Sequence, residues 1–136
     1  MLGRILVADD SSSIRAFLKR LIESRSSSWK ICAEAADGQQ AIQMALDSKP
    51  DLVILDLQMP LMDGLIAAAR IIKFLPTIPI LLNTVHKSEY VDSEAKKIGV
   101  REVISKADAG ELLRAVERWL GKEPQKAKSA KQETRK

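Results

Sequence analysis

Residues 4–13 read RILVADDSSS, and the composition of this stretch is unusual for its position in a chain. Four apolar residues that suit a buried strand are followed at once by two carboxylates, Asp9 and Asp10, and then by three serines. Two like charges 4 Å apart repel each other by about 4 kcal/mol at an effective dielectric near 20. Another part of the chain is therefore expected to compensate this repulsion.

The composition indicates one ordinary domain. The chain has 136 residues, of which 46% are hydrophobic, and this is enough for a single core. No apolar run of about 18 residues and no N-terminal signal pattern occurs, so we expect a soluble, cytoplasmic protein without membrane contacts. Cys32 is the only cysteine, which excludes an intramolecular disulfide and a cysteine zinc site. We expect it to be a small buried residue in a strand.

The net charge of +4 comes entirely from the C-terminal segment. Residues 122–136 hold six Lys or Arg against two Glu, whereas residues 1–121 carry sixteen residues of each sign. Since the segment 122–136 has no large apolar side chain, we expect a disordered basic tail or a truncated linker. The folded domain, residues 1–121, is then neutral and is not expected to bind nucleic acid directly. A tail that grips phosphate backbones is the less favoured interpretation.

Short apolar runs alternate with amphipathic helical patterns through residue 121. Apolar residues at helical spacing predict five helices, which contain the segments Ile14–Ile22, Ile42–Leu46, Leu65–Ile72, Val91–Ile98 and Leu112–Leu120. Polar caps stand near four starts, at Asp10 or Ser11, Asp37, Asp63 and Asp108, and two ends are followed by Gly99 and Gly121. The expected strands are RILVA (4–8), KICAEA (30–35), DLVILD (51–56), IPILLN (78–83) and REVIS (101–105).

This alternation favours an α/β fold with a parallel sheet that helices cover on both faces. LVIL (52–55) and ILL (80–82) are apolar without alternation, as central strands are, whereas KICAEA alternates Ile31, Ala33 and Ala35 with polar or small residues. The second strand is therefore expected at an edge. We predict a doubly wound (α/β)5 flavodoxin-like sandwich with strand order 2-1-3-4-5, whose ligand crevice lies at the carboxyl ends of strands one and three.

Polar side chains follow four of the expected strands at this edge of the sheet. Asp9 and Asp10 follow the first strand and Asp56 ends the third, so three carboxylates are expected to meet. A hard divalent cation such as Mg2+ takes oxygen ligands and would compensate their repulsion. The hydroxyl of Thr84 and the ammonium of Lys106 follow the other two strands. Both groups can stabilise a phosphoryl group on a carboxylate that acts as a nucleophile.

Four motifs in this order resemble the receiver domains of two-component response regulators. They are VADD (7–10), LDLQMPLMDG (55–64), NT (83–84) and SK (105–106), and the resemblance covers residues 3–121. It implies that Asp56 accepts a phosphoryl group from a sensor histidine kinase or a phosphotransfer protein.

The resemblance also implies a role for each remaining polar residue of the crevice. Asp10, Asp56 and the backbone carbonyl of Gln58 bind Mg2+ in such domains, and Asp9 reaches the ion through water. Thr84 and Lys106 hold the phosphoryl oxygens and relay the state to a surface around the fourth helix, fifth strand and fifth helix. A downstream output protein or domain reads this surface, and the protein is a monomer or a phosphorylation-dependent dimer. Its chemistry is limited to phosphorylation and dephosphorylation of itself, so it is not expected to be an enzyme.

Three residues depart from the common pattern of this family. Val103 stands where an aromatic side chain is usual, so the usual aromatic readout is not available. Ala107 stands in place of a proline that has a cis bond. A cis bond to alanine costs about 2.5–4 kcal/mol, so we expect either retained strain or a trans bond. Val85 replaces a smaller alanine, and we expect it to narrow access to Asp56 and to slow self-phosphorylation from small donors.

Three functional classes stay open on the sequence alone. The first is a stand-alone phosphoacceptor switch that acts by protein contact. The second is the receiver half of a DNA-binding transcriptional regulator whose helix-turn-helix output domain is absent from this chain. A metal-dependent phosphatase or a flavin protein on the same fold is disfavoured, because Gln58 stands where a second acid would be needed and Asp9 and Asp10 would repel a flavin phosphate. His86, in the loop after Thr84, is expected to be an exposed residue.

Overall fold

The computed structural model describes residues 3–121, and the expected tail, residues 122–136, lies outside them. Strands and helices alternate strictly along the chain. The strands are β1 (Gly3–Ala8), β2 (Trp29–Ala35), β3 (Leu52–Leu55), β4 (Ile80–Thr84) and β5 (Glu102–Ser105). The helices are α1 (Ser12–Arg25), α2 (Gly38–Ser48), α3 (Gly64–Phe74), α4 (Glu89–Ile98) and α5 (Ala109–Leu120).

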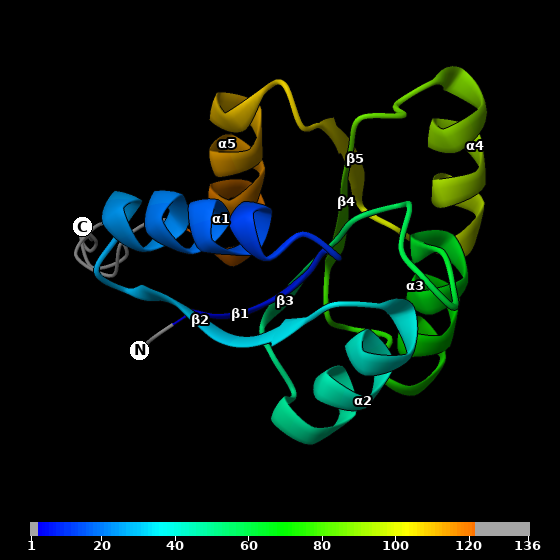
Figure 1. The fold of residues 1–136 in the computed structure, drawn as a ribbon, viewed down its shortest axis with the longest axis horizontal. Coiled ribbons are helices and arrows are strands. Elements are labelled where there is room, and N and C mark those ends of the chain that lie inside the picture. Colours follow the sequence, from blue (N-terminus) through cyan, green and yellow to red (C-terminus); the bar gives the residue numbers. More distant parts are fainter. Residues whose placement is uncertain (1–2, 122–136) are drawn as a thin grey trace, which may run out of the picture.

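All five strands are parallel and pair in the order β2-β1-β3-β4-β5, which confirms the predicted doubly wound (α/β)5 sandwich. Helices α1 and α5 cover one face of the sheet, and α2, α3 and α4 cover the other (Figure 1). None of the helices formed by residues 3–121 combines the length and the apolar composition needed to cross a bilayer.

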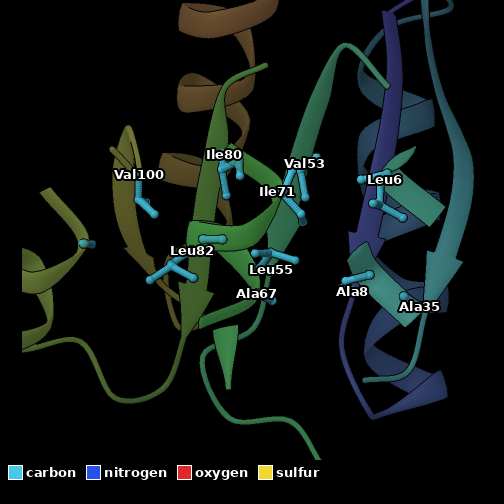
Figure 2. Packing of buried hydrophobic residues seen from close by; sticks show 14 of the residues in the cluster. Leu6, Ala8, Ala35, Val53, Leu55, Ala67, Ile71, Ile80, Leu82 and Val100 are labelled. Carbon is cyan, nitrogen blue, oxygen red and sulfur yellow. The ribbon is translucent and has the colours of Figure 1, made fainter. Parts of the chain in front are cut away.

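Each face of the sheet buries its own apolar cluster. Strands β3 and β4 are buried at every residue, because helices cover both of their faces. On one face Leu55 packs against Ala67 and Ile71 of α3 (Figure 2). On the other face Ile54 packs in a cluster with Leu112 of α5. Each fully buried leucine or isoleucine side chain contributes about 1.5–3 kcal/mol to the stability of the fold. The two clusters therefore hold the strand ends in place.

The edge strand β2 contains a β-bulge at Cys32. Ile5 pairs with Ile31, but the next residue of β1 pairs with Ala33, so Cys32 is the extra residue. As a result Ile31 packs against the cluster beneath α1 and α5, whereas Ala33 packs on the opposite face. The regular alternation expected for Ile31, Ala33 and Ala35 is therefore interrupted. Cys32 is half-buried, and the expectation that it is buried was wrong.

Short polar side chains cap the starts of the helices. Ser11 accepts a hydrogen bond from Ile14 N and caps α1, so Asp10 is not needed as a cap. The predicted caps of α2, α3 and α5 are confirmed, and they are Asp37, Asp63 and Asp108. Helix α4 is capped by Ser88, which the sequence analysis did not single out, and ends at Gly99 with a φ of 110°.

Candidate functional site

Three carboxylates meet where β1 and β3 end, at the point where the strand order reverses. Asp9 and Asp10 directly follow β1, and Asp56 directly follows β3. The two strand ends are joined because Asp56 N donates a hydrogen bond to Ala8 O at 2.9 Å. One oxygen from each of the three carboxylates lies within 4.8 Å of the others. The structure thus brings together the acids that the sequence placed at this edge.

Lys106, which follows β5, lies between the two buried members of this cluster. Asp9 and Asp56 are 1% and 6% exposed, whereas Asp10 is exposed. The Nζ of Lys106 is 2.7 Å from Asp9 Oδ2 and 3.1 Å from Asp56 Oδ2. This shared ammonium compensates part of the repulsion between the acids.

The pKa values of Asp56 and Lys106 reflect both burial and the contacts of the shared ammonium. Burial raises the pKa of the Asp56 carboxyl above its ordinary value, and the neighbouring Lys106 opposes the rise only in part. Burial alone would lower the pKa of Lys106, but its contacts with Asp9 and Asp56 outweigh that effect and raise the pKa. Both pKa values therefore move upward for different reasons: burial outweighs the contact with Lys106 at Asp56, whereas contacts with two carboxylates outweigh burial at Lys106.

The acidic cluster fits a hard cation. Asp9 Oδ1 accepts a hydrogen bond from Ser11 N at 2.9 Å. Asp9 Oδ2 is buried and accepts no hydrogen bond from residues 3–121, so its contact with Lys106 is an ion pair alone. A buried carboxylate oxygen with unused acceptor capacity, next to two further carboxylates, is a donor set that suits Mg2+.

An open pocket of about 340 Å³ lies over the cluster. Its polar wall is formed by Asp10, Asp56, Gln58 and Lys106, and the rest by Met59, Pro60, Val85 and His86. The backbone N–H of Gln58 favours the charged form of the Asp56 carboxylate. His86 is exposed as expected, and Val85 is 68% exposed. The pocket has the size and charge to admit a small anionic group together with a cation.

Thr84 ends β4 but does not line this pocket. Its side chain is fully buried, and Oγ1 accepts a hydrogen bond from His86 N at 3.0 Å. Its backbone carbonyl accepts a hydrogen bond from Lys106 N at 3.0 Å, which joins the ends of β4 and β5. Sequence reasoning identified the strand end at which Thr84 lies. The Thr84 hydroxyl, however, is hydrogen-bonded within the local turn and does not line the pocket.

The other departures from the family pattern are also defined by the structure. No cis peptide bond occurs within residues 3–121, so the Lys106–Ala107 bond is trans, which was one of the two expected outcomes. Ala107 N donates to Ser105 Oγ at 3.1 Å. Val103 is partly buried and packs against the cluster beneath α2, α3 and α4.

Two residues to which the sequence analysis gave no role in the site hold its backbone in place. A Cβ atom at Gly64 would overlap the Asp56 carbonyl oxygen, so only glycine lets α3 start this close to Asp56. Arg15 on α1 donates a hydrogen bond to Asp9 O at 2.6 Å. A signal for Arg15 was present, because helical side chains lean toward the N-terminus and Arg15 lies one turn after the cap Ser11.

Comparison with protein-family models identifies one match over most of the chain. The model described as the response regulator receiver domain matches residues 5–117. Protein CcdB of Bacillus subtilis is 32% identical over 119 residues, which are 87% of this chain and 98% of that protein. A protein-glutamate methylesterase/protein-glutamine glutaminase of Maricaulis maris is 35% identical over 118 residues, which are 85% of this chain. The match spans only 29% of that longer relative.

Solved structures show the same similarity. The response regulator domain of Thermotoga maritima CheB has a TM-score of 0.81 and 27% identity, and the match covers 91% of this chain and 100% of that one. A two-component response regulator of the LuxR family from Aurantimonas has a TM-score of 0.84 and 30% identity, with 94% of each chain covered. A chain of the CheX-CheY-BeF3-Mg2+ complex from Borrelia burgdorferi has a TM-score of 0.81 and 25% identity, with coverages of 88% and 90%.

Proposed function

This chain belongs to the response regulator receiver domain family, and we propose that it is switched by transfer of a phosphoryl group to Asp56. The proposed donor is a sensor histidine kinase or a phosphotransfer protein, and the proposed cofactor is Mg2+. The observation that carries the proposal is the position of Asp56, a buried carboxylate that lines an open pocket, 3.1 Å from an ammonium and beside two further acids. A cytoplasmic location is part of the proposal.

The proposed ligands of Mg2+ are the carboxylates of Asp10 and Asp56 and the backbone carbonyl of Gln58, with Asp9 acting through water. Support comes from the acidic cluster and from the buried oxygen of Asp9 that accepts no hydrogen bond from the described residues. The similar chain from Borrelia burgdorferi is part of a complex that contains BeF3 and Mg2+. When bound, Mg2+ supplies positive charge that stabilises the charge developing on the phosphoryl oxygens.

The proposed step is an in-line displacement at phosphorus. An oxygen of Asp56 forms a bond to phosphorus while the bond from phosphorus to the donor nitrogen breaks, and that nitrogen keeps the electron pair and takes a proton from solvent. Lys106 is near enough to exchange its contact with Asp56 Oδ2 for a phosphoryl oxygen. Thr84 must give up its hydrogen bond with His86 N to reach another oxygen. Water later attacks phosphorus, releases phosphate and restores the carboxylate.

We propose that the phosphorylated state is read at the face formed by α4, β5 and α5. A groove of about 430 Å³ between α4 and β5 is lined in part by Lys96, Arg101 and Val103. Glu102 of β5 accepts a hydrogen bond from Trp119 Nε1 of α5 at 2.7 Å, so β5 and α5 are linked. A displacement at the end of β5, where Lys106 stands, can therefore reach both helices. Output through this face would involve a monomer or a phosphorylation-dependent dimer.

A second candidate is the receiver half of a DNA-binding transcriptional regulator with an output domain in a longer protein. The similarity to the regulator of the LuxR family supports this candidate. The stand-alone switch is supported by CcdB, of which the match covers 98%. An immunoblot of source cells with an antibody against this chain separates the two, because only the regulator would be markedly longer than 136 residues.

Phosphorylation is tested with acetyl phosphate and phosphoramidate as small donors, in the presence of Mg2+ and with detection by intact-protein mass. We expect the wild-type protein to gain one phosphoryl group and Asp56→Asn to gain none. Asp47→Asn is the control, because it removes the same charge from an exposed position on α2. Equal labelling of Asp56→Asn, or no labelling of the wild-type protein by either donor, would contradict the proposal.

Output is tested by hydrogen exchange with and without beryllofluoride and Mg2+. Altered protection in α4, β5 and α5 is the expected result. Changes confined to α1 and α2 would argue against the proposed output face while leaving the phosphorylation chemistry intact.

A further inference from the structure

We propose that Arg15 is a positioning residue for the magnesium site, because its guanidinium fixes the turn that presents Asp9 and Asp10. The inference rests on the proposed function, since it takes these acids to bind Mg2+. It adds a residue of α1 that lies outside the motifs of the crevice.

Arg15 bridges the acidic turn and the edge strand β2. Its Nη1 donates a hydrogen bond to Asp9 O at 2.6 Å, and its Nε donates one to Glu34 Oε1 at 3.0 Å. The Arg15 side chain is only 17% exposed. Because the guanidinium is planar and rigid, two bonds from different N–H groups fix its orientation, which the single ammonium of a lysine cannot do.

Both backbone polar groups of Asp9 are held on the β2 side of the site. Asp9 N donates to Ala35 O at 3.0 Å, and Asp9 O accepts the bond from Arg15. The carbonyl of Asp9 belongs to the peptide plane that leads into Asp10. The Asp10 side chain makes no hydrogen bond or ion pair with residues 3–121, so its place in the site depends on this backbone. Arg15 therefore controls where Asp10 stands.

The two bonds of Arg15 do not contribute equally. The Glu34 side chain is 42% exposed, and an ion pair in such a position contributes little. The bond to the Asp9 carbonyl is made by a charged donor near the buried end of β1 and is the stronger of the two. We therefore place the effect on the carbonyl contact, and Glu34→Gln, which keeps an acceptor for Nε, should leave Mg2+ binding almost unchanged.

On removal of Arg15, electrostatics alone predicts a change in Mg2+ affinity opposite in direction to the change that positioning predicts. Arg15 carries a positive charge next to the cation site, so its removal without any change in geometry would strengthen Mg2+ binding. If Arg15 positions the turn, its removal weakens binding instead, because the carboxylate of Asp10 is no longer held near the other ligands. The direction of the change in affinity thus separates the two roles.

The test is calorimetric titration with MgCl2 of the wild-type protein, Arg15→Met and Arg15→Lys. We expect Arg15→Met to raise the Mg2+ dissociation constant about tenfold, as is usual when a group that orients a metal ligand is removed. Arg15→Lys keeps the charge and should also weaken binding, so it carries the test where Arg15→Met does not fold. Arg25→Met is the matched control, because Arg25 lies at the other end of α1 and bonds Glu117 at 2.8 Å.

A second measurement separates positioning from general destabilisation. At saturating Mg2+ the Arg15 variants should be labelled by acetyl phosphate at nearly the wild-type rate, whereas the Mg2+ concentration for half the maximal rate should rise. If both Arg15 variants bind Mg2+ as tightly as the wild-type protein, or more tightly, the role of Arg15 is overturned. Mg2+ binding by the wild-type protein would still support the proposed function in that case. Absence of Mg2+ binding by the wild-type protein overturns both.

Discussion

The ammonium of Lys106 lies 2.7 Å from Asp9 Oδ2, which is closer than its distance of 3.1 Å from Asp56 Oδ2. Lys106 therefore stabilises the most buried acid of the cluster as well as the proposed phosphoacceptor. The repulsion between the acids that follow β1 is thus partly compensated by a residue that follows β5, before any metal ion binds.

Substitution of Lys106 should lower the stability of the folded protein and tighten its binding of Mg2+. Lys106→Met leaves the buried charge of Asp9 without its counter-ion, and we expect a loss of about 2 kcal/mol in the free energy of unfolding. Mg2+ should restore most of this loss, because the ion takes over the compensation. Urea unfolding with and without Mg2+ measures both effects. Lys97→Met, in an exposed ion pair of α4, is the control, and an equal loss in both variants would contradict the assignment.

Asp10→Asn should weaken Mg2+ binding at least tenfold without lowering the stability measured in the absence of Mg2+. Removal of an exposed charge beside two buried carboxylates relieves repulsion, so the melting temperature without Mg2+ should stay the same or rise slightly. Differential scanning calorimetry and Mg2+ titration provide the two readouts. A melting temperature below that of the Asp47→Asn control would count against this account.

Val85→Ala should accelerate phosphorylation by small donors severalfold. Val85 lines the pocket over Asp56 and its exposed side chain narrows the approach of a donor such as acetyl phosphate. Leu61→Ala is the control, because Leu61 is 84% exposed but does not line the pocket. The rate of mass gain is the measurement, and equal rates for the wild-type protein and Val85→Ala would refute the prediction.

Two glycine-to-alanine substitutions should have opposite effects on stability. Gly64→Ala forces α3 away from the Asp56 carbonyl, and we expect a loss of about 1–3 kcal/mol together with slower labelling. Gly110→Ala lies in α5, where a Cβ meets its nearest neighbour at 3.5 Å. There alanine should stabilise the helix by up to about 1 kcal/mol. Chemical denaturation of both variants measures the two changes in the free energy of unfolding. Losses of similar size in both variants would contradict the prediction.

The stability that Glu102 contributes should depend on pH in the acidic range. The Arg118 guanidinium holds the pKa of the Glu102 carboxyl below its ordinary value of 4.5, with help from the Trp119 N–H and against the effect of burial. A carboxyl whose pKa is lower in the folded state stabilises the fold above its ordinary pKa and loses that contribution as the pH falls through the folded-state value.

Comparison of the wild-type protein with Glu102→Gln checks this direction. The difference in unfolding free energy should be about 1 kcal/mol at pH 7 and should shrink steadily below about pH 4.5. Glu94→Gln, in an exposed ion pair of α4, should show a smaller difference throughout. A difference that grows on acidification would reverse the sign and sink the prediction.

Much of the fold followed from local patterns in the chain. The apolar spacing predicted every helix and strand of residues 3–121, and the uninterrupted apolar runs identified β3 and β4 as central strands. What the patterns missed depends on pairing between strands. The bulge at Cys32 reverses the faces of β2 partway along, and no periodicity within KICAEA contains that information because the register is set by β1.

The order of residues along the chain was enough to predict which acids lie at one edge of the sheet. Parallel strands all end on the same side, so the positions of Asp9, Asp10 and Asp56 after their strands were enough to predict that they meet. The long-range contacts among side chains depend on how the helices and strands pack together. Lys106 meets Asp56 across 50 residues, and Arg15 meets Glu34 across 19. These two contacts follow from distances between packed elements, which residue order does not encode locally.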